Sequence, residues 1–84
     1  MNSIQWHPRA IKQLLKINRP DQVRIKDAAA GLALMPYCQQ VKALTKHRSQ
    51  YRLRVGHYRI FFNLDGNVRI VSIEEVSKRD ERTY

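Results

Sequence analysis

The sequence predicts an α+β domain, in which a small twisted antiparallel sheet packs against two N-terminal helices. Two observations carry this prediction. Residues 51–62 alternate between apolar and basic side chains on both sides of a Gly-His break, which is typical of a half-buried strand hairpin. Before residue 36, two stretches instead repeat apolar residues at helical spacing. A chain of 84 residues makes one domain, residues 1–84, with a small core.

The first part of the chain predicts one short strand followed by two helices. Residues 3–6 alternate between polar and apolar side chains, which favours a strand of four or five residues. A helix from about Pro8 to Ile17 follows, because proline suits the first helical turn. Asp21 is a suitable N-cap for a second helix that ends at Met35. The apolar side of that helix is expected to comprise Val23, Ile25, Ala28, Ala29, Leu32 and Met35.

A two-residue turn at Gly56-His57 sets the register of the central hairpin. Arg54 then lies opposite Arg59, and both share one face with Arg52. The opposite, core face carries Tyr51, Leu53, Val55, Tyr58, Ile60 and Phe62. Like charges directly opposite each other destabilise a sheet by up to about 1 kcal/mol. Three guanidinium groups on one face therefore indicate a bound anion, and their planar donors suit a phosphate. A solvated basic strand face is the alternative interpretation.

A third strand, over about residues 68–76, completes the predicted three-strand meander after a turn signalled by Asp65-Gly66. A two-residue turn would pair Phe62 with Arg69, whereas a three-residue turn would pair it with Ile70. The second register is preferred because it keeps the core face apolar. It leaves three apolar residues on the arginine side: Phe61, Val71 and Ile73.

The charge of the chain predicts a polyanionic or acidic partner. Sixteen Lys and Arg against seven Asp and Glu give a net charge of +9, which favours nucleic acid, an anionic membrane or an acidic protein. No apolar run is long enough to span a membrane, and the N-terminus lacks the features of a secretory signal, so a cytoplasmic protein is expected. The single Cys38 and the scattered histidines match no metal-binding spacing, so neither metal nor cofactor is expected.

The segment just before the hairpin is also basic. Lys46, His47 and Arg48 are positioned to extend the arginine side into a flank for a long anion such as RNA, and a solvated loop is the alternative. The acidic pair Glu74-Glu75 in the third strand of the meander is a candidate neutraliser of this basic surface.

The order of elements and two motifs resemble the RelE/ParE toxin superfamily of toxin–antitoxin systems. The motifs are Tyr51-Arg52-Leu53-Arg54-Val55-Gly56-His57-Tyr58-Arg59 and Lys78-Arg79-Asp80-Glu81-Arg82-Thr83-Tyr84. The resemblance covers nearly the whole chain and implies the α+β fold described above. RelE-type members of the family are endoribonucleases that cut mRNA in the ribosomal A site without a metal. ParE-type members share the fold but inhibit DNA gyrase by binding.

The resemblance also implies roles for individual residues. The catalytic set it implies is Arg52, Arg54, Arg59, Arg79 and Tyr84. RelE itself has lysines where this chain has Arg52 and Arg54, and arginine cannot serve as a general base. Tyr84 is therefore the first candidate for the base, followed by His57 and Lys78. The residues expected to contact the RNA flank are Lys46, His47, Arg48, His57, Lys78 and Arg82.

Three functions follow as alternatives. The resemblance favours a ribosome-dependent mRNA endoribonuclease that acts by attack of the 2′-hydroxyl on the adjacent phosphate and so inhibits translation. A ParE-type gyrase inhibitor and a non-catalytic RNA- or ribosome-binding module are the other two. Both toxin interpretations imply a cognate antitoxin with an acidic amphipathic helix. The ribosome and mRNA are the further partners expected of the endoribonuclease.

Overall fold

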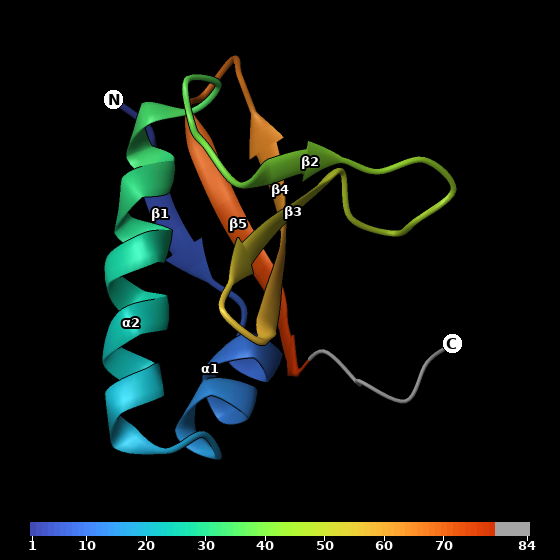
Figure 1. The fold of residues 1–84 in the computed structure, drawn as a ribbon. Coiled ribbons are helices and arrows are strands. Elements are labelled where there is room, and N and C mark those ends of the chain that lie inside the picture. The colour runs from blue at the N-terminus through green and yellow to red at the C-terminus, as the bar shows by residue number, and fades with distance from the viewer. Residues whose placement is uncertain (79–84) are drawn as a thin grey trace.

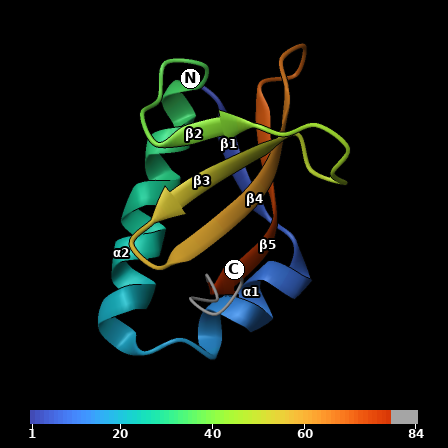
Figure 2. The same cartoon turned by 45° about the vertical axis from the view of Figure 1, so that its right-hand side comes forward.

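The computed structural model describes residues 1–78. Within them, a five-stranded sheet carries helices on one of its faces (Figure 1). The elements are β1 (Ser3–Trp6), α1 (Pro8–Leu15), α2 (Arg19–Ala30), the 3₁₀ helix η1 (Gly31–Leu34), β2 (Val41–Ala43), β3 (Tyr51–Val55), β4 (Tyr58–Asp65) and β5 (Ile70–Lys78). Figure 2 shows the strands crossing one another at an angle, the twist predicted for this sheet. None of the helices in residues 1–78 has the length and apolar composition that crossing a membrane requires.

The sheet is mixed, which corrects the prediction of an antiparallel sheet. Its strand order is β1-β5-β4-β3-β2, and β1 runs parallel to β5. Parallel neighbours need a long crossover connection, and the two helices and the hairpin that separate β1 from β5 supply one. The backbone N–H groups of Ser3 and His7 donate to the carbonyls of Arg69 and Ile73, which ties both ends of β1 to β5.

The hairpin β3–β4 has the predicted register. Arg54 lies opposite Arg59, and Leu53 lies opposite Ile60. Val41–Ala43 adds a short antiparallel edge strand, β2, beside β3. Side-chain alternation and a two-residue turn are both local features, so the β3–β4 hairpin could be derived from the sequence alone.

The register between β4 and β5 differs from both predicted alternatives. Phe62 lies opposite Ile73, because four residues separate β4 from β5. A register shift between Phe61 and Phe62 then places Phe61 opposite Glu75. The longer turn is held by Asp65, whose Oδ1 accepts hydrogen bonds from the N–H groups of Asn67 and Val68. The shift leaves Glu74 without a partner across the two strands, as in a β-bulge.

This register changes which residues reach the core. Val71 and Ile73 are fully buried among the core residues, so the prediction that they lie on the arginine side is wrong. Phe61 does lie on the arginine side, as predicted, yet only 9% of it is exposed. The complete core comprises Ala10, Leu14, Ile25, Ala29, Leu32, Met35, Leu53, Ile60, Phe62, Val71, Ile73 and Val76.

The helices differ from prediction at their ends. Helix α1 ends at Leu15, two residues earlier than expected, and α2 becomes the 3₁₀ helix η1 after Ala30. Asn18, not Asp21, caps α2, because the Asn18 Oδ1 accepts the Asp21 N–H at 3.0 Å. On the predicted apolar side of α2, Val23 remains 50% exposed.

Candidate functional site

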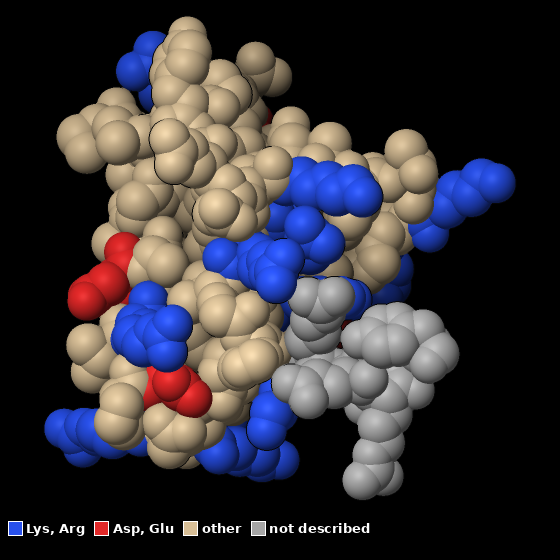
Figure 3. Space-filling view, viewed as in Figure 1, with Lys and Arg blue, Asp and Glu red and all other residues tan. Residues whose placement is uncertain are grey.

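The sheet face opposite the helices carries Arg52, Arg54 and Arg59, and we call it the arginine face. Leu53 and Ile60 are buried against the helices, so their neighbours along β3 and β4 point the other way. Arg54 and Arg59 face each other across the two strands. In Figure 3, Lys and Arg side chains gather over the strands on the side away from α2. The predicted cluster of three arginines is therefore present.

Acidic side chains of residues 1–78 do not neutralise these arginines. None of the three forms an ion pair within that range. The Nε atom of Arg52 is buried there without a hydrogen-bond partner. Buried polar groups in proteins are nearly always hydrogen-bonded. The Nε–H group of Arg52, on β3 next to the edge strand, is thus a donor without an acceptor among residues 1–78, which suits it to hold an anionic ligand.

Lys42 adds a further positive charge that was not predicted for the site. It is the register partner of Arg52 on the edge strand β2, and it is exposed. Direct partners share a face of the sheet, so Lys42 belongs to the arginine face. In the sequence, Lys42 stands between the apolar residues Val41 and Ala43, as a residue on the polar face of a strand would. A strand of three residues is too short for this alternation to be recognised.

The basic loop before β3 reaches the arginine face through two of its three predicted residues. The His47 ring stacks on the Phe61 ring, with centroids 4.7 Å apart and an angle of 15° between the planes. Arg48 Nη2 lies 4.0 Å from Glu75 Oε1. Glu75 thus pairs with the loop and not with the three arginines. Lys46 is exposed and has a backbone φ of 57°.

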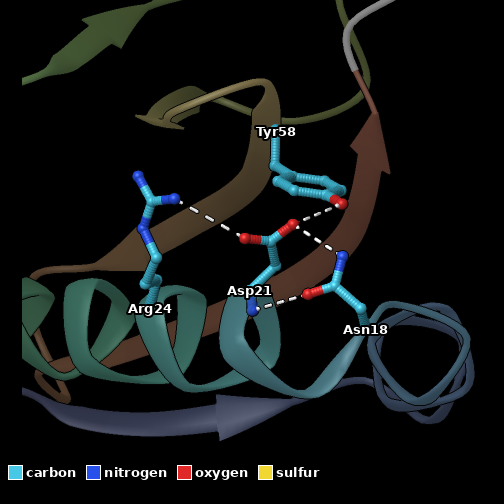
Figure 4. Close-up of polar contacts among 4 residues, drawn as sticks. All are labelled: Asn18, Asp21, Arg24 and Tyr58. Carbon is cyan, nitrogen blue, oxygen red and sulfur yellow. Dashed lines mark hydrogen bonds and ion pairs between the residues drawn. The ribbon is translucent and has the colours of Figure 1, made fainter.

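A polar cluster on the helix side holds the turn of the hairpin (Figure 4). The Asp21 Oδ2 accepts hydrogen bonds from the Asn18 side-chain amide at 2.9 Å and the Tyr58 hydroxyl at 3.0 Å. These two bonds hold the pKa of Asp21 below its usual value, and the nearby charges of Arg24 and His57 act in the same direction. Burial, and then the hydrogen bond to Asp21, raise the pKa of Tyr58.

Two residues predicted for the site lie away from the three arginines, one on the other side of the sheet and one in the hairpin turn. Lys78 is the register partner of Tyr58. It lines an open cavity of about 420 Å³ with Gln13 of α1 and with residues 16–18 after that helix, so it does not join the arginines. His57 lies in the turn between β3 and β4, and its charge helps to lower the pKa of Asp21 on α2. Arg79, Arg82 and Tyr84 lie outside the described residues.

The arginine face is equipped to bind phosphate and to stabilise negative charge. Guanidinium groups donate paired hydrogen bonds to phosphate oxygens, but they cannot accept a proton. Among residues 1–78, no group of three or more His, Cys, Asp or Glu side chains is placed to hold a metal ion. The described part of the site therefore offers electrostatic stabilisation of a phosphate.

A family model identifies the family of the chain. The family model for the ParE toxin of the type II toxin–antitoxin system parDE matches residues 4–83. No curated protein matches the sequence at a significant level.

Several solved structures share the fold. The RelBE2 toxin–antitoxin complex of Mycobacterium tuberculosis superposes with a TM-score of 0.82 at 21% identity, covering 93% of this chain and 98% of that chain. The isolated Escherichia coli RelE toxin gives a TM-score of 0.81 at 15% identity, covering 99% of this chain and 89% of that chain. The archaeal RelE–RelB complex of Pyrococcus horikoshii gives a TM-score of 0.80 at 19% identity, covering 95% of this chain and 97% of that chain.

Identities this low establish the shared fold, while the family model spans almost the whole chain. The chain therefore belongs to the ParE toxin family, within the RelE/ParE superfamily, and is the toxin of a type II toxin–antitoxin system.

Proposed function

We propose that this toxin is an endoribonuclease that cuts mRNA on the ribosome, in the cytoplasm, and so inhibits translation. The observation that carries the proposal is the pairing of Arg54 with Arg59, beside Arg52, with no acidic partner in residues 1–78. Such a pairing costs folding stability. A bound polyanion offsets that cost, and the planar donors of three arginines match the phosphates of an RNA strand.

The proposed reaction needs no metal. The 2′-oxygen of one nucleotide loses its proton and attacks the adjacent phosphorus, the bond to the 5′-oxygen breaks, and that oxygen gains a proton. The products are a 2′,3′-cyclic phosphate and a 5′-hydroxyl. Arg52, Arg54 and Arg59 would hold the phosphate and stabilise the negative charge that develops on it. The proposal keeps Arg79 as a further phosphate ligand and Tyr84 as the general base, because both match the motif of RelE-type members.

A second candidate function is inhibition of DNA gyrase by binding. The observation in its favour is that the matching family model is that of ParE. The arginine face would then serve as a binding surface without chemistry. A non-catalytic RNA- or ribosome-binding module is the third candidate, and it uses the same surface.

We also propose a cognate antitoxin as partner. The structural relatives include RelE–RelB complexes. An antitoxin with an acidic amphipathic helix would complement a toxin of net charge +9 and cover its arginine face.

The deciding experiment is primer extension on a reporter mRNA in a reconstituted translation system, with and without ribosomes. The proposal expects discrete cuts within A-site codons only when ribosomes are present. Arg59→Gln should reduce cutting at least tenfold, since the loss of one charge-stabilising donor typically costs about a hundredfold or more. Lys26→Gln is the matched control, because Lys26 is exposed on α2, on the opposite side of the sheet, and its loss should change nothing.

Each other outcome points to one alternative. Intact mRNA together with loss of gyrase supercoiling activity would establish the gyrase inhibitor. Intact mRNA with stalled translation and unaffected gyrase would leave the binding module. Cutting that is equal in Arg59→Gln and wild type would remove the arginine face from the site.

A further inference from the structure

Phe61 is an aromatic residue in an unexpected place. It lies on the arginine face, where its register partners are Arg52 on β3 and Glu75 on β5. Arg59 precedes it by two residues on β4 and so points to the same side. An apolar ring at the centre of a charged surface would expose its face to water, yet Phe61 is only 9% exposed.

A ring from the loop between β2 and β3 covers one face of Phe61. The His47 imidazole lies flat against the Phe61 ring, with centroids 4.7 Å apart and an angle of 15° between the planes. The His47 Nδ1 accepts a hydrogen bond of 2.9 Å from the Ser49 N–H, which orients the imidazole. His47 itself remains exposed. A flat, nitrogen-containing ring thus occupies one face of Phe61.

The loop is anchored at its base and held weakly at its tip. At the base, Leu44 donates its N–H to the Gln50 carbonyl at 2.8 Å. The Gln50 N–H donates to the Asn63 Oδ1, and the Gln50 Oε1 accepts a hydrogen bond from the Leu64 N–H. Beyond the His47 ring, Arg48, which is exposed, contacts the half-buried Glu75 of β5 at 4.0 Å. The loop projects from the sheet on the side away from α2 (Figure 1).

Space for movement lies beside the loop. An open cavity of about 330 Å³ is lined by the loop and by the ends of β2 and β3, His47 included. His47 therefore borders open space, and the hydrogen bonds at the base of the loop do not involve it.

We propose that Phe61 is a nucleobase-stacking platform and that the His47 ring occupies the place of the base in the free toxin. Sites for single-stranded nucleic acid combine cationic groups for the backbone with an aromatic face for the bases. Arg52 and Arg59 flank Phe61 and supply the first part, and Phe61 supplies the second. RNA binding displaces His47, and the base takes over its contact. This proposal rests on the proposed function, since it needs RNA at the arginine face.

The test compares two RNA trinucleotides on the full-length toxin by NMR titration. One carries all three bases, and the other has the same backbone with an abasic central position. In the free protein, the His47 ring protons should be shifted upfield by the Phe61 ring. The complete RNA should remove that shift, and the abasic RNA should leave it in place.

Two variants and a control separate displacement from general packing. His47→Ala should bind the complete RNA about fivefold more tightly, because a competing aromatic stack of ordinary strength is removed, and should bind the abasic RNA unchanged. Phe61→Leu keeps an apolar side chain and should reduce the preference for the complete RNA about tenfold. Tyr37→Leu removes an aromatic residue that is 88% exposed and distant in sequence, and should change neither affinity.

Each remaining result overturns the proposal in a recognisable way. Equal binding of both RNAs, with the His47 signals unmoved, would refute the platform while leaving RNA binding and cleavage intact. Weaker binding by His47→Ala would mean that His47 contacts the RNA instead of yielding to it. Binding of neither RNA would reject the platform, and the ribosome experiment above would then decide the proposed function separately.

Discussion

The hydroxyl of Tyr58 donates a hydrogen bond to the carboxylate of Asp21 at 3.0 Å, across 37 positions of sequence. This bond joins the start of β4 to the first turn of α2. Tyr58 and Arg59 are neighbours on one strand, so their side chains point to opposite faces of the sheet. The contact on the helix side therefore helps to fix the position of Arg59 on the other side.

Tyr58→Phe should destabilise the toxin without removing its positive charges. The variant loses the hydroxyl and leaves Asp21 with one fewer donor. We expect the melting temperature to fall on the order of 5 °C for a domain of this size. Thermal unfolding followed by circular dichroism would measure the change. Tyr37→Phe, at a residue that is 88% exposed, is the matched control and should melt like wild type.

The lowered pKa of Asp21 makes part of the stability dependent on pH. Above the ordinary carboxyl value of 3.8, Asp21 is charged in both states and its contribution is complete. As the pH falls through the lower pKa of the folded state, that contribution is lost. The stability difference between wild type and Asp21→Asn should therefore be constant from pH 5 to 7 and shrink below pH 4.

Urea unfolding between pH 3 and 7 would measure this difference. The acid sensitivity of Tyr58→Phe should lie between the other two proteins, since it retains the hydrogen bond from Asn18. A difference in the free energy of unfolding between wild type and Asp21→Asn that stays constant down to pH 3 would contradict the lowered pKa of Asp21.

Arg59→Gln should separate stability from toxicity. Relief of the repulsion with Arg54 should leave the free energy of unfolding unchanged or raise it by up to about 1 kcal/mol. Toxicity should nevertheless be lost, because the cluster loses one of its phosphate donors. Urea unfolding and growth after induced expression would measure the two effects. If Arg59→Gln proves clearly less stable than Lys26→Gln, the pair is not repulsive and the argument for a bound anion weakens.

Gly56→Ala should strain the hairpin turn. Gly56 has a φ of +57°, and a Cβ there would lie 3.3 Å from Arg24 Nη2. The left-handed conformation costs a non-glycine residue roughly 1–2 kcal/mol, and the melting temperature should fall by several degrees. Gly66→Ala is the matched control, since a Cβ at Gly66 would meet nothing within 4 Å. Equal melting temperatures for the two variants would contradict the strain.

The central hairpin and its arginines could be derived from the chain alone. Side-chain alternation and a two-residue turn are short-range features, and together they specify that Arg54 faces Arg59. The functional roles of Arg79 and Tyr84 stay predictions, since both residues lie outside the described part of the chain.

The remaining relationships depend on contacts between segments far apart in sequence. Asp65 holds a longer turn than the pattern suggested, which brings Ile73 opposite Phe62, and a register shift next to Phe62 brings Glu75 opposite Phe61. The direction of β1 follows from its pairing with a strand more than sixty residues away. The stacking of His47 on Phe61 likewise requires the folded loop. The periodicity of the sequence indicates on which face of an element a residue lies. Which distant residue it contacts there depends on the packing energy of the whole domain.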